Sequence, residues 1–207
     1  MIDTELGKLR RSHYSDELNS SMDGIQVTVM GWVLTVRGHG NISFATVRDK
    51  NGDLSIVAKK GDCPDEIREK ISSLKAHSSI GIIGIIKASE KAPSGFEIIP
   101  TELRVFSEVT TIPPFEPTAK TVKNIDTRLE VRPIDLRRNV LQHVFKTRSL
   151  VLKTIRDYFN DQNFIEINTP KMIATATEGG AALFPIFYYN KEAFLAQSPQ
   201  LYKEQLT

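Results

Sequence analysis

The fold of the first half of this chain is decided by residues 25–60, which read IQVTVMGWVLTVRGHGNISFATVRDKNGDLSIVAKK. Apolar residues alternate along the chain from Ile25 to Leu34, and a period of two is typical of a β-strand. The glycines of RGHG at 37–40 and the Asn-Gly pair at 51–52 then mark turns. The segment therefore predicts three consecutive strands.

A helix and two further strands follow this segment. Residues 63–78, CPDEIREKISSLKAHS, place Ile67, Ile71 and Leu74 at helical spacing and carry Pro64 near the start. Residues 79–89 and 95–107 then alternate again as two strands. The order of three strands, one helix and two strands predicts an all-β oligonucleotide-binding (OB) barrel, in which the helix plugs the barrel between its third and fourth strands.

Composition limits the class of protein. The chain has 207 residues, 40% apolar and 25% charged, with a formal net charge of only +2, so bulk charge gives no argument for nucleic acid. The apolar run at 79–86 is too short to cross a bilayer, and the start lacks a signal-peptide core. The single Cys63 favours a reducing compartment, and the scattered histidines predict no metal site. We expect a soluble cytoplasmic protein.

The second half begins after a proline-rich stretch. Residues 110–121 hold three prolines without periodicity, and residues 120–148 hold eight basic and three acidic residues. A helix is predicted from Leu136 to Asn163, followed by strands at 164–172, 183–189 and 193–200. We therefore expect an OB domain over 1–109, a linker and basic hinge over 110–135, and the start of an α+β domain with an antiparallel sheet over 136–207.

Four strings in the second half carry a resemblance to a known family. They read RLEVRPIDLRR, NFIEINTP, TATEGGAALFPIFYY and AFLAQSPQLYKEQL, and they resemble the archaeal and eukaryotic type of aspartyl-tRNA synthetase, a class II aminoacyl-tRNA synthetase. That family carries an N-terminal OB barrel that reads the anticodon, then a hinge and a catalytic domain. The resemblance implies an aspartate–tRNA ligase, in which the proline of NFIEINTP, Pro170, packs at the homodimer interface of the full-length form.

The resemblance also implies an aspartate pocket. Glu178, on a Gly-rich loop, is expected to hold the ammonium group of aspartate, although an exposed turn is the simpler interpretation of this loop. Ser198 and Gln200 are expected near the amino end, and Lys203 at the side-chain carboxylate. A straight strand points Gln200 and Lys203 to opposite faces, so the chain must turn or become helical near Leu201.

In the barrel, the resemblance implies that Phe44 stacks on an anticodon base and that Arg37 contacts a phosphate or base nearby. Packing of Phe44 in the core remains the alternative. Ser55 stands where the family commonly has a glutamine that contacts anticodon bases. Leu34 and Pro93 favour an enzyme that discriminates tRNA-Asp from tRNA-Asn, the second candidate RNA partner.

The reaction of the family consumes ATP with Mg²⁺ and passes through aspartyl-adenylate. The arginines that bind the triphosphate come from two later signature motifs, which are missing here, so we expect this chain to lack the ATP site, to have no catalytic residue of its own and to be inactive alone. A truncated gene or a deliberate fragment is expected. The alternatives are a free-standing OB-type RNA-binding or regulatory paralogue and a relative of asparaginyl-tRNA synthetase, against which Lys203 argues.

Overall fold

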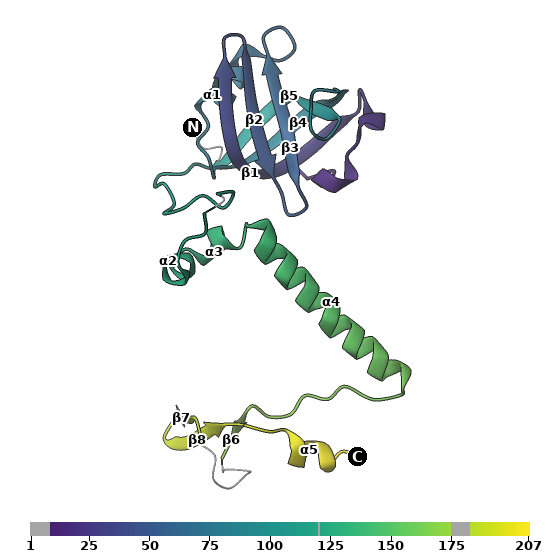
Figure 1. The fold of residues 1–207 in the computed structure, drawn as a ribbon, viewed down its shortest axis with the longest axis vertical. Coiled ribbons are helices and arrows are strands. Elements are labelled where there is room, and N and C mark those ends of the chain that lie inside the picture. Colours follow the sequence, from purple (N-terminus) through teal and green to yellow (C-terminus); the bar gives the residue numbers. More distant parts are fainter. Residues whose placement is uncertain (1–8, 120, 175–182) are drawn as a thin grey trace. The chain divides into compact units, whose positions relative to one another are not determined.

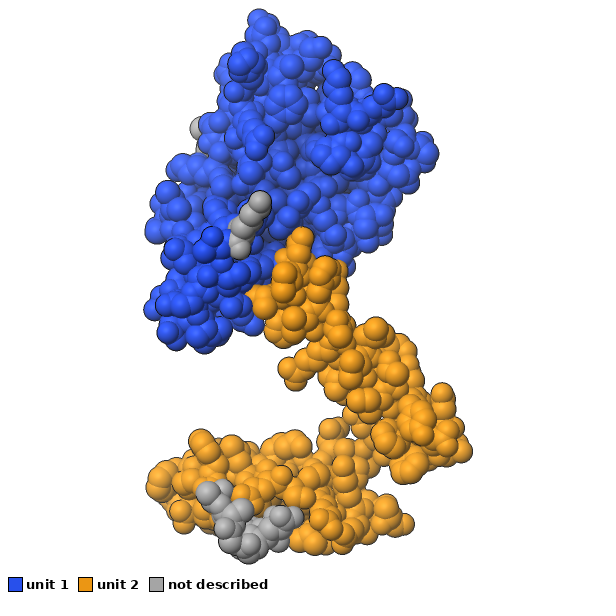
Figure 2. All heavy atoms as spheres, viewed as in Figure 1, with its two compact units in different colours: residues 1–138 blue, residues 139–207 orange. Residues whose placement is uncertain are grey.

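The structure is a computed structural model that describes residues 9–119, 121–174 and 183–207. The chain divides into two compact units, unit 1 (Met1–Arg138) and unit 2 (Asn139–Thr207), which Figure 2 shows in different colours.

Unit 1 is built around a closed five-stranded barrel (Figure 1). Its regular elements are β1 (Gln26–His39), β2 (Ile42–Arg48), β3 (Asp53–Lys59), α1 (Asp65–Ser73), β4 (Ser79–Ala88) and β5 (Phe96–Ser107). The strand order is β1-β2-β3-β5-β4, and β1 closes the barrel by pairing with β4. The predicted order of three strands, one helix and two strands is confirmed, as is the OB-type barrel.

The barrel core is filled by the inward-facing residues of the alternating strands. Val29, Ile56 and Ile98 are completely buried, and α1 adds Ile71, which is also fully buried. Two glycines allow close approach between strands: a Cβ at Gly31 would lie 2.4 Å from the carbonyl oxygen of Arg48, and one at Gly84 would lie 2.6 Å from that of Ile99. These contacts are incompatible with any side chain, so glycine is required where β1 and β4 pass their neighbours.

Short elements flank the barrel within unit 1. They are η1 (Ser15–Glu17), η2 (Ser20–Met22), α2 (Ile125–Glu130) and α3 (Arg132–Asp135). On the N-terminal side, the buried carboxylate of Asp49 accepts hydrogen bonds from the backbone N–H and the hydroxyl of Ser15, both at 2.7 Å. On the C-terminal side, the guanidinium of Arg137 lies 4.3 Å from the ring centroid of Trp32 on β1. Arg137, just after the predicted hinge, therefore contacts the barrel.

Unit 2 contains one long helix and a small antiparallel sheet. Its elements are α4 (Asn139–Asp161), β6 (Met172–Ile173), β7 (Pro185–Tyr188), β8 (Lys191–Leu195) and α5 (Gln200–Glu204). The strand order is β6-β8-β7, with both pairs antiparallel. The helix begins at Asn139 and not at the predicted Leu136, and it ends at Asp161, two residues before Asn163. Asn163 has φ at 63°, the left-handed conformation that was predicted for it.

Two predicted elements of unit 2 differ in the structure. Residues 164–171 form no regular strand, because among the described residues β8 offers a pairing partner only to Met172–Ile173. The expected strand at 193–200 ends at Leu195, and the chain enters α5 at Gln200. This change from strand to helix is the condition under which Gln200 and Lys203 can face one ligand.

Candidate functional site

A hollow of about 510 Å³ lies on the outer face of β1, β2 and β3. It is lined by the side chains of Arg37, His39, Phe44 and Ser55, among others. Phe44 is 40% exposed, so its ring is available to a ligand and is not part of the barrel core. The structure thus brings together three of the residues singled out in the sequence, namely Arg37, Phe44 and Ser55.

Strand pairing places these residues opposite each other. Arg37 pairs with Phe44 across β1 and β2, and Thr46, two residues along β2, pairs with Thr35 on one side and Ser55 on the other. Two layers therefore cross the face: a cation beside an aromatic ring, and a row of three hydroxyl groups. A ring beside a cation suits an unstacked base and its phosphate.

A β-bulge in β1 creates this arrangement. The register shifts between Val33, which pairs with Val47, and Thr35, which pairs with Thr46, so Leu34 is the extra residue. Without the bulge, the alternation that buries Val29 and Val33 would also turn Arg37 inward. The bulge reverses that alternation and brings Arg37 to the face of Phe44, a common use of bulges at functional sites.

Two other residues singled out in the sequence lie outside this hollow. Leu34, at the bulge, is half-buried, and Pro93 is exposed in the loop between β4 and β5. Neither lines the hollow with Phe44.

Of two arginines near this hollow, Arg48 is paired with an acid and Arg37 is paired with none that the structure describes. The guanidinium of Arg48 donates two hydrogen bonds to Asp53, at 2.5 and 2.7 Å, and this carboxylate raises the pKa of Arg48. Arg37 has no ion pair within the described part of the chain, so its cation remains free to contact an anionic ligand.

A second hollow, of about 360 Å³, lies in unit 2 against α5. Its lining residues are Ser198, Pro199, Gln200, Lys203, Glu204 and Thr207. The side chains of Gln200, Lys203 and Glu204 lie three and four positions apart, which is the spacing of neighbours on a helix surface. The three expected aspartate-pocket residues of this segment therefore line one hollow.

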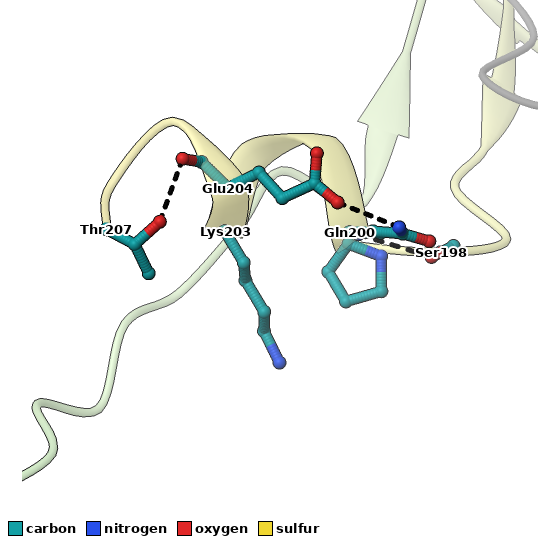
Figure 3. A pocket seen from close by; sticks show the side chains of 6 residues that line it. Ser198, Gln200, Lys203, Glu204 and Thr207 are labelled. Atoms are coloured by element: carbon teal, nitrogen blue, oxygen red, sulfur yellow. Dashed lines mark hydrogen bonds between the residues drawn. The ribbon is translucent and has the colours of Figure 1, made fainter.

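Hydrogen bonds organise the start of α5 (Figure 3). The hydroxyl of Ser198 accepts from the backbone N–H of Gln200 at 3.2 Å, and the amide of Gln200 donates to Glu204 at 2.8 Å. Lys203 extends away from the Glu204 side chain and has no ion pair with a described residue. Glu204 was not anticipated, because an acid at this position becomes a neighbour of Gln200 only in a helix.

The sequence singles out two further residues in the second half, Glu178 and Pro170. Glu178 lies outside the described residues. Pro170 is exposed in the irregular segment that leads to β6.

A third polar cluster, at the hinge, had no signal in the sequence beyond its basic composition. Asp135 is fully buried and accepts from Arg128 at 3.0 Å, Arg132 at 2.6 Å and Arg138 at 3.5 Å. Burial alone would raise the pKa of Asp135, but these arginines hold it below its ordinary value. Arg137 beside them has a pKa lowered by burial, and its Nη1 finds no hydrogen-bond partner in the described structure.

No group of three or more His, Cys, Asp or Glu side chains among the described residues is placed to hold a metal ion. No helix among them is both long and apolar enough to cross a membrane.

Comparison with curated proteins finds similar sequences over nearly the whole chain. An aspartate–tRNA(Asp/Asn) ligase of Methanococcus aeolicus is 48% identical over 201 residues, which is 97% of this chain and 46% of the relative. The ligase of the same name from Methanocaldococcus jannaschii is 48% identical over 199 residues, 96% of this chain and 45% of the relative. The chain thus spans about half the length of the curated relatives it matches.

Solved structures agree on the fold. The asparaginyl-tRNA synthetase of Pyrococcus horikoshii complexed with asparaginyl-adenylate aligns with a TM-score of 0.85 at 30% identity, over 96% of this chain and 45% of that one. The aspartyl-tRNA synthetase of Entamoeba histolytica aligns with a TM-score of 0.76 at 28% identity, over 96% of this chain and 43% of that one.

Two domain families match, one in each half of the chain. Residues 27–106 match the OB-fold nucleic acid binding domain, which covers the barrel. Residues 124–207 match the class II tRNA synthetases of the D, K and N group. The chain therefore combines an OB-fold nucleic acid-binding domain with residues that match the class II tRNA synthetase domain.

Proposed function

We propose that this chain is the RNA-binding and amino-acid-binding part of an aspartate–tRNA ligase, which attaches aspartate to tRNA-Asp with ATP. The observation that carries the proposal is Lys203, a cation without an ion pair among the described residues, in the hollow at α5 of a chain 48% identical to aspartate–tRNA(Asp/Asn) ligases. A cation complements the side-chain carboxylate of aspartate and gives no such advantage to the amide of asparagine.

In this proposal the barrel binds the anticodon loop of the tRNA. Phe44 stacks on a base, Arg37 contacts a phosphate or base, and Ser55 contributes a hydroxyl. The names of the relatives include both tRNA-Asp and tRNA-Asn, so tRNA-Asn is the second candidate partner, and Leu34 and Pro93 are the candidate positions for discrimination.

The hollow at α5 forms one wall of the aspartate pocket. Lys203 binds the side-chain carboxylate, while Ser198 and Gln200 lie toward the amino end, and Glu178 holds the ammonium group. ATP and Mg²⁺ act in the longer enzyme. We expect arginines to bind the triphosphate of ATP, and the sequence contains no arginine after Arg156.

A homodimer and a cytoplasmic location complete the proposal. The single Cys63 supports a reducing compartment.

The exposed Pro170 segment and the exposed apolar side chains of α4 support a homodimer interface in unit 2. Sedimentation equilibrium of the full-length enzyme tests the interface: we expect a dimer, weakened by Pro170→Ala, whereas a monomer at all concentrations contradicts it.

Amino-acid binding separates the candidate ligands. Calorimetric titration of the 207-residue chain should detect L-aspartate in preference to L-asparagine, and Lys203→Met should abolish that preference. Lys191→Met, a change of an exposed lysine in β8, is the control. Equal or better binding of L-asparagine would favour the alternative of a relative of asparaginyl-tRNA synthetase, the enzyme whose Pyrococcus horikoshii structure aligns with this chain.

RNA binding tests the barrel. We expect the chain to bind a tRNA-Asp anticodon stem-loop, and Phe44→Ala to weaken binding by about 1–3 kcal/mol. Ile85→Ala on β4 is a matched control, since Ile85 is also 40% exposed. RNA binding without any amino-acid binding supports the free-standing RNA-binding alternative. Aspartate-dependent ATP–pyrophosphate exchange by this chain alone contradicts the expected lack of an ATP site.

A further inference from the structure

Three hydroxyl groups form a row across the outer face of the barrel, one layer from Phe44. Thr35 on β1 and Ser55 on β3 both pair with Thr46 on β2. The hydroxyls of Thr35 and Thr46 lie 3.2 Å apart and are hydrogen-bonded. All three residues line the hollow that contains the Phe44 ring.

The spacing of the row relates it to a stacked base. Thr46 follows Phe44 by two residues on β2, so both side chains lie on the same face about 7 Å apart along the strand. A base stacked on the Phe44 ring is wide enough to bring one edge over the neighbouring layer. Each hydroxyl can both donate and accept a hydrogen bond, so the row can match the polar groups of a base edge.

Within the described structure, the three hydroxyl groups keep unused hydrogen-bonding capacity. Thr35 and Thr46 each use one hydroxyl contact on the other, and this leaves further hydrogen-bonding capacity on both oxygen atoms. The Ser55 hydroxyl makes no hydrogen bond within the described residues, and it is half-buried on the same face. The row is therefore polar, partly shielded from water and able to bind a ligand.

We propose that Thr35, Thr46 and Ser55 read the edge of the base that stacks on Phe44. The inference rests on the proposed function of the barrel as an RNA-binding face. It divides the labour between the two layers: the Phe44 ring gives affinity that does not depend on the base, because every base has a π-face, and the hydroxyl row gives the preference among bases.

If the row of Thr35, Thr46 and Ser55 only stabilised the sheet, a different result would be expected. A cross-strand Thr–Thr pair stabilises a sheet by about 0.2–1 kcal/mol, and its loss would lower stability without changing the preference among bases. Thr46→Val removes the hydroxyl but keeps the shape and the strand preference of the residue, so it separates the two roles.

The test measures fluorescence anisotropy of the 207-residue chain with anticodon-loop RNAs that carry A, C, G, U or an abasic residue at each loop position in turn. The wild-type chain should prefer one base at one position. Thr46→Val should reduce that preference about fivefold and leave the abasic RNA unaffected. Phe44→Ala should weaken all RNAs with a base at this position by a similar factor.

Further variants guard against indirect effects. Thr46→Ser restores a hydroxyl and should restore the preference, and Ser55→Ala should reduce it independently of Thr46. Thr101→Val changes an exposed threonine on β5 and should alter nothing. If Phe44→Ala weakens binding while Thr46→Val and Ser55→Ala both keep the base preference, the inference is wrong and the RNA-binding proposal stands. If the wild-type chain binds no RNA, both are wrong.

Discussion

The barrel buries its apolar side chains within its own sheet, whereas the long helix of unit 2 leaves its apolar side chains exposed. In unit 1, Val29 and Ile56 are fully buried and Phe96 is 2% exposed. In α4 no residue is buried, and Val144, Ile155 and Phe159 are 46–55% exposed. The same amphipathic chemistry thus gives a self-contained core in one unit and a face that requires another surface in the other.

This difference leads us to expect that the barrel is stable by itself and that α4 depends on what covers it. A helix gains most of its stability in a protein from packing of its apolar face. The following changes test how far the two units differ, in order of decreasing expected effect.

Removal of a phenylalanine from each unit should have very different consequences. Phe96→Ala in the barrel is expected to lower the free energy of unfolding by about 3–5 kcal/mol, because it leaves a cavity. Phe159→Ala, in a residue 46% exposed, is expected to lower it by less than about 1.5 kcal/mol, since only edge contacts with Tyr158 and Phe164 are lost. Urea unfolding followed by circular dichroism measures both; similar losses would refute the contrast.

Asp135→Asn, measured by urea unfolding, tests the buried carboxylate that holds three arginines together. We expect a loss of about 1–3 kcal/mol, because Arg128, Arg132 and Arg138 keep their charges without the buried carboxylate. Asp65→Asn, in an exposed pair with Arg68, is the control.

The same variant predicts a change in acid sensitivity. The pKa of Asp135 is lower in the folded chain than the value of about 3.9 for an unfolded aspartate. Its contribution to stability is therefore present above that value and is lost as the pH falls through the folded pKa. Urea unfolding between neutral and acid pH should show a shallower decline for Asp135→Asn than for the wild type; an unchanged decline would show that other acids control it.

Arg137→Ala tests the contact between the hinge and Trp32. Trp32 is the one tryptophan in the sequence, so its fluorescence reports directly on this cation–π contact. We expect a change in the emission spectrum and a loss of about 0.5–2 kcal/mol. Arg148→Ala, in an exposed arginine of α4, should leave the spectrum unchanged. An emission spectrum that is unchanged in Arg137→Ala would show that Arg137 does not contact Trp32.

The smallest effect is expected at an exposed ion pair of α4. Lys153 and Asp157 are hydrogen-bonded one helical turn apart. Lys153→Ala should lower stability by no more than about 0.5 kcal/mol, and added salt should remove the difference. A loss several times larger would mean that this face of α4 is not simply solvated.

The elements of the barrel were predictable because their signals are local. Alternation with period two, the Asn-Gly turn and the helical spacing of Ile67 and Ile71 each depend on a few adjacent residues. The segment at 164–171 was not predictable in the same way. Its apolar residues favour a strand, but a strand exists only where a neighbour pairs with it, and pairing is a property of the fold.

The sequence by itself determined the order of the barrel elements and the identity of the polar residues in both candidate sites. Only the tertiary structure decided which of them meet. The bulge at Leu34 turns Arg37 to the face of Phe44 and aligns Thr35 with Thr46, and it arises from pairing between β1 and β2. Likewise, Arg128 of α2 meets the buried carboxylate of Asp135 in α3 because these two short helices lie against each other. Alternation is a local property, but register and burial depend on partners distant in the chain.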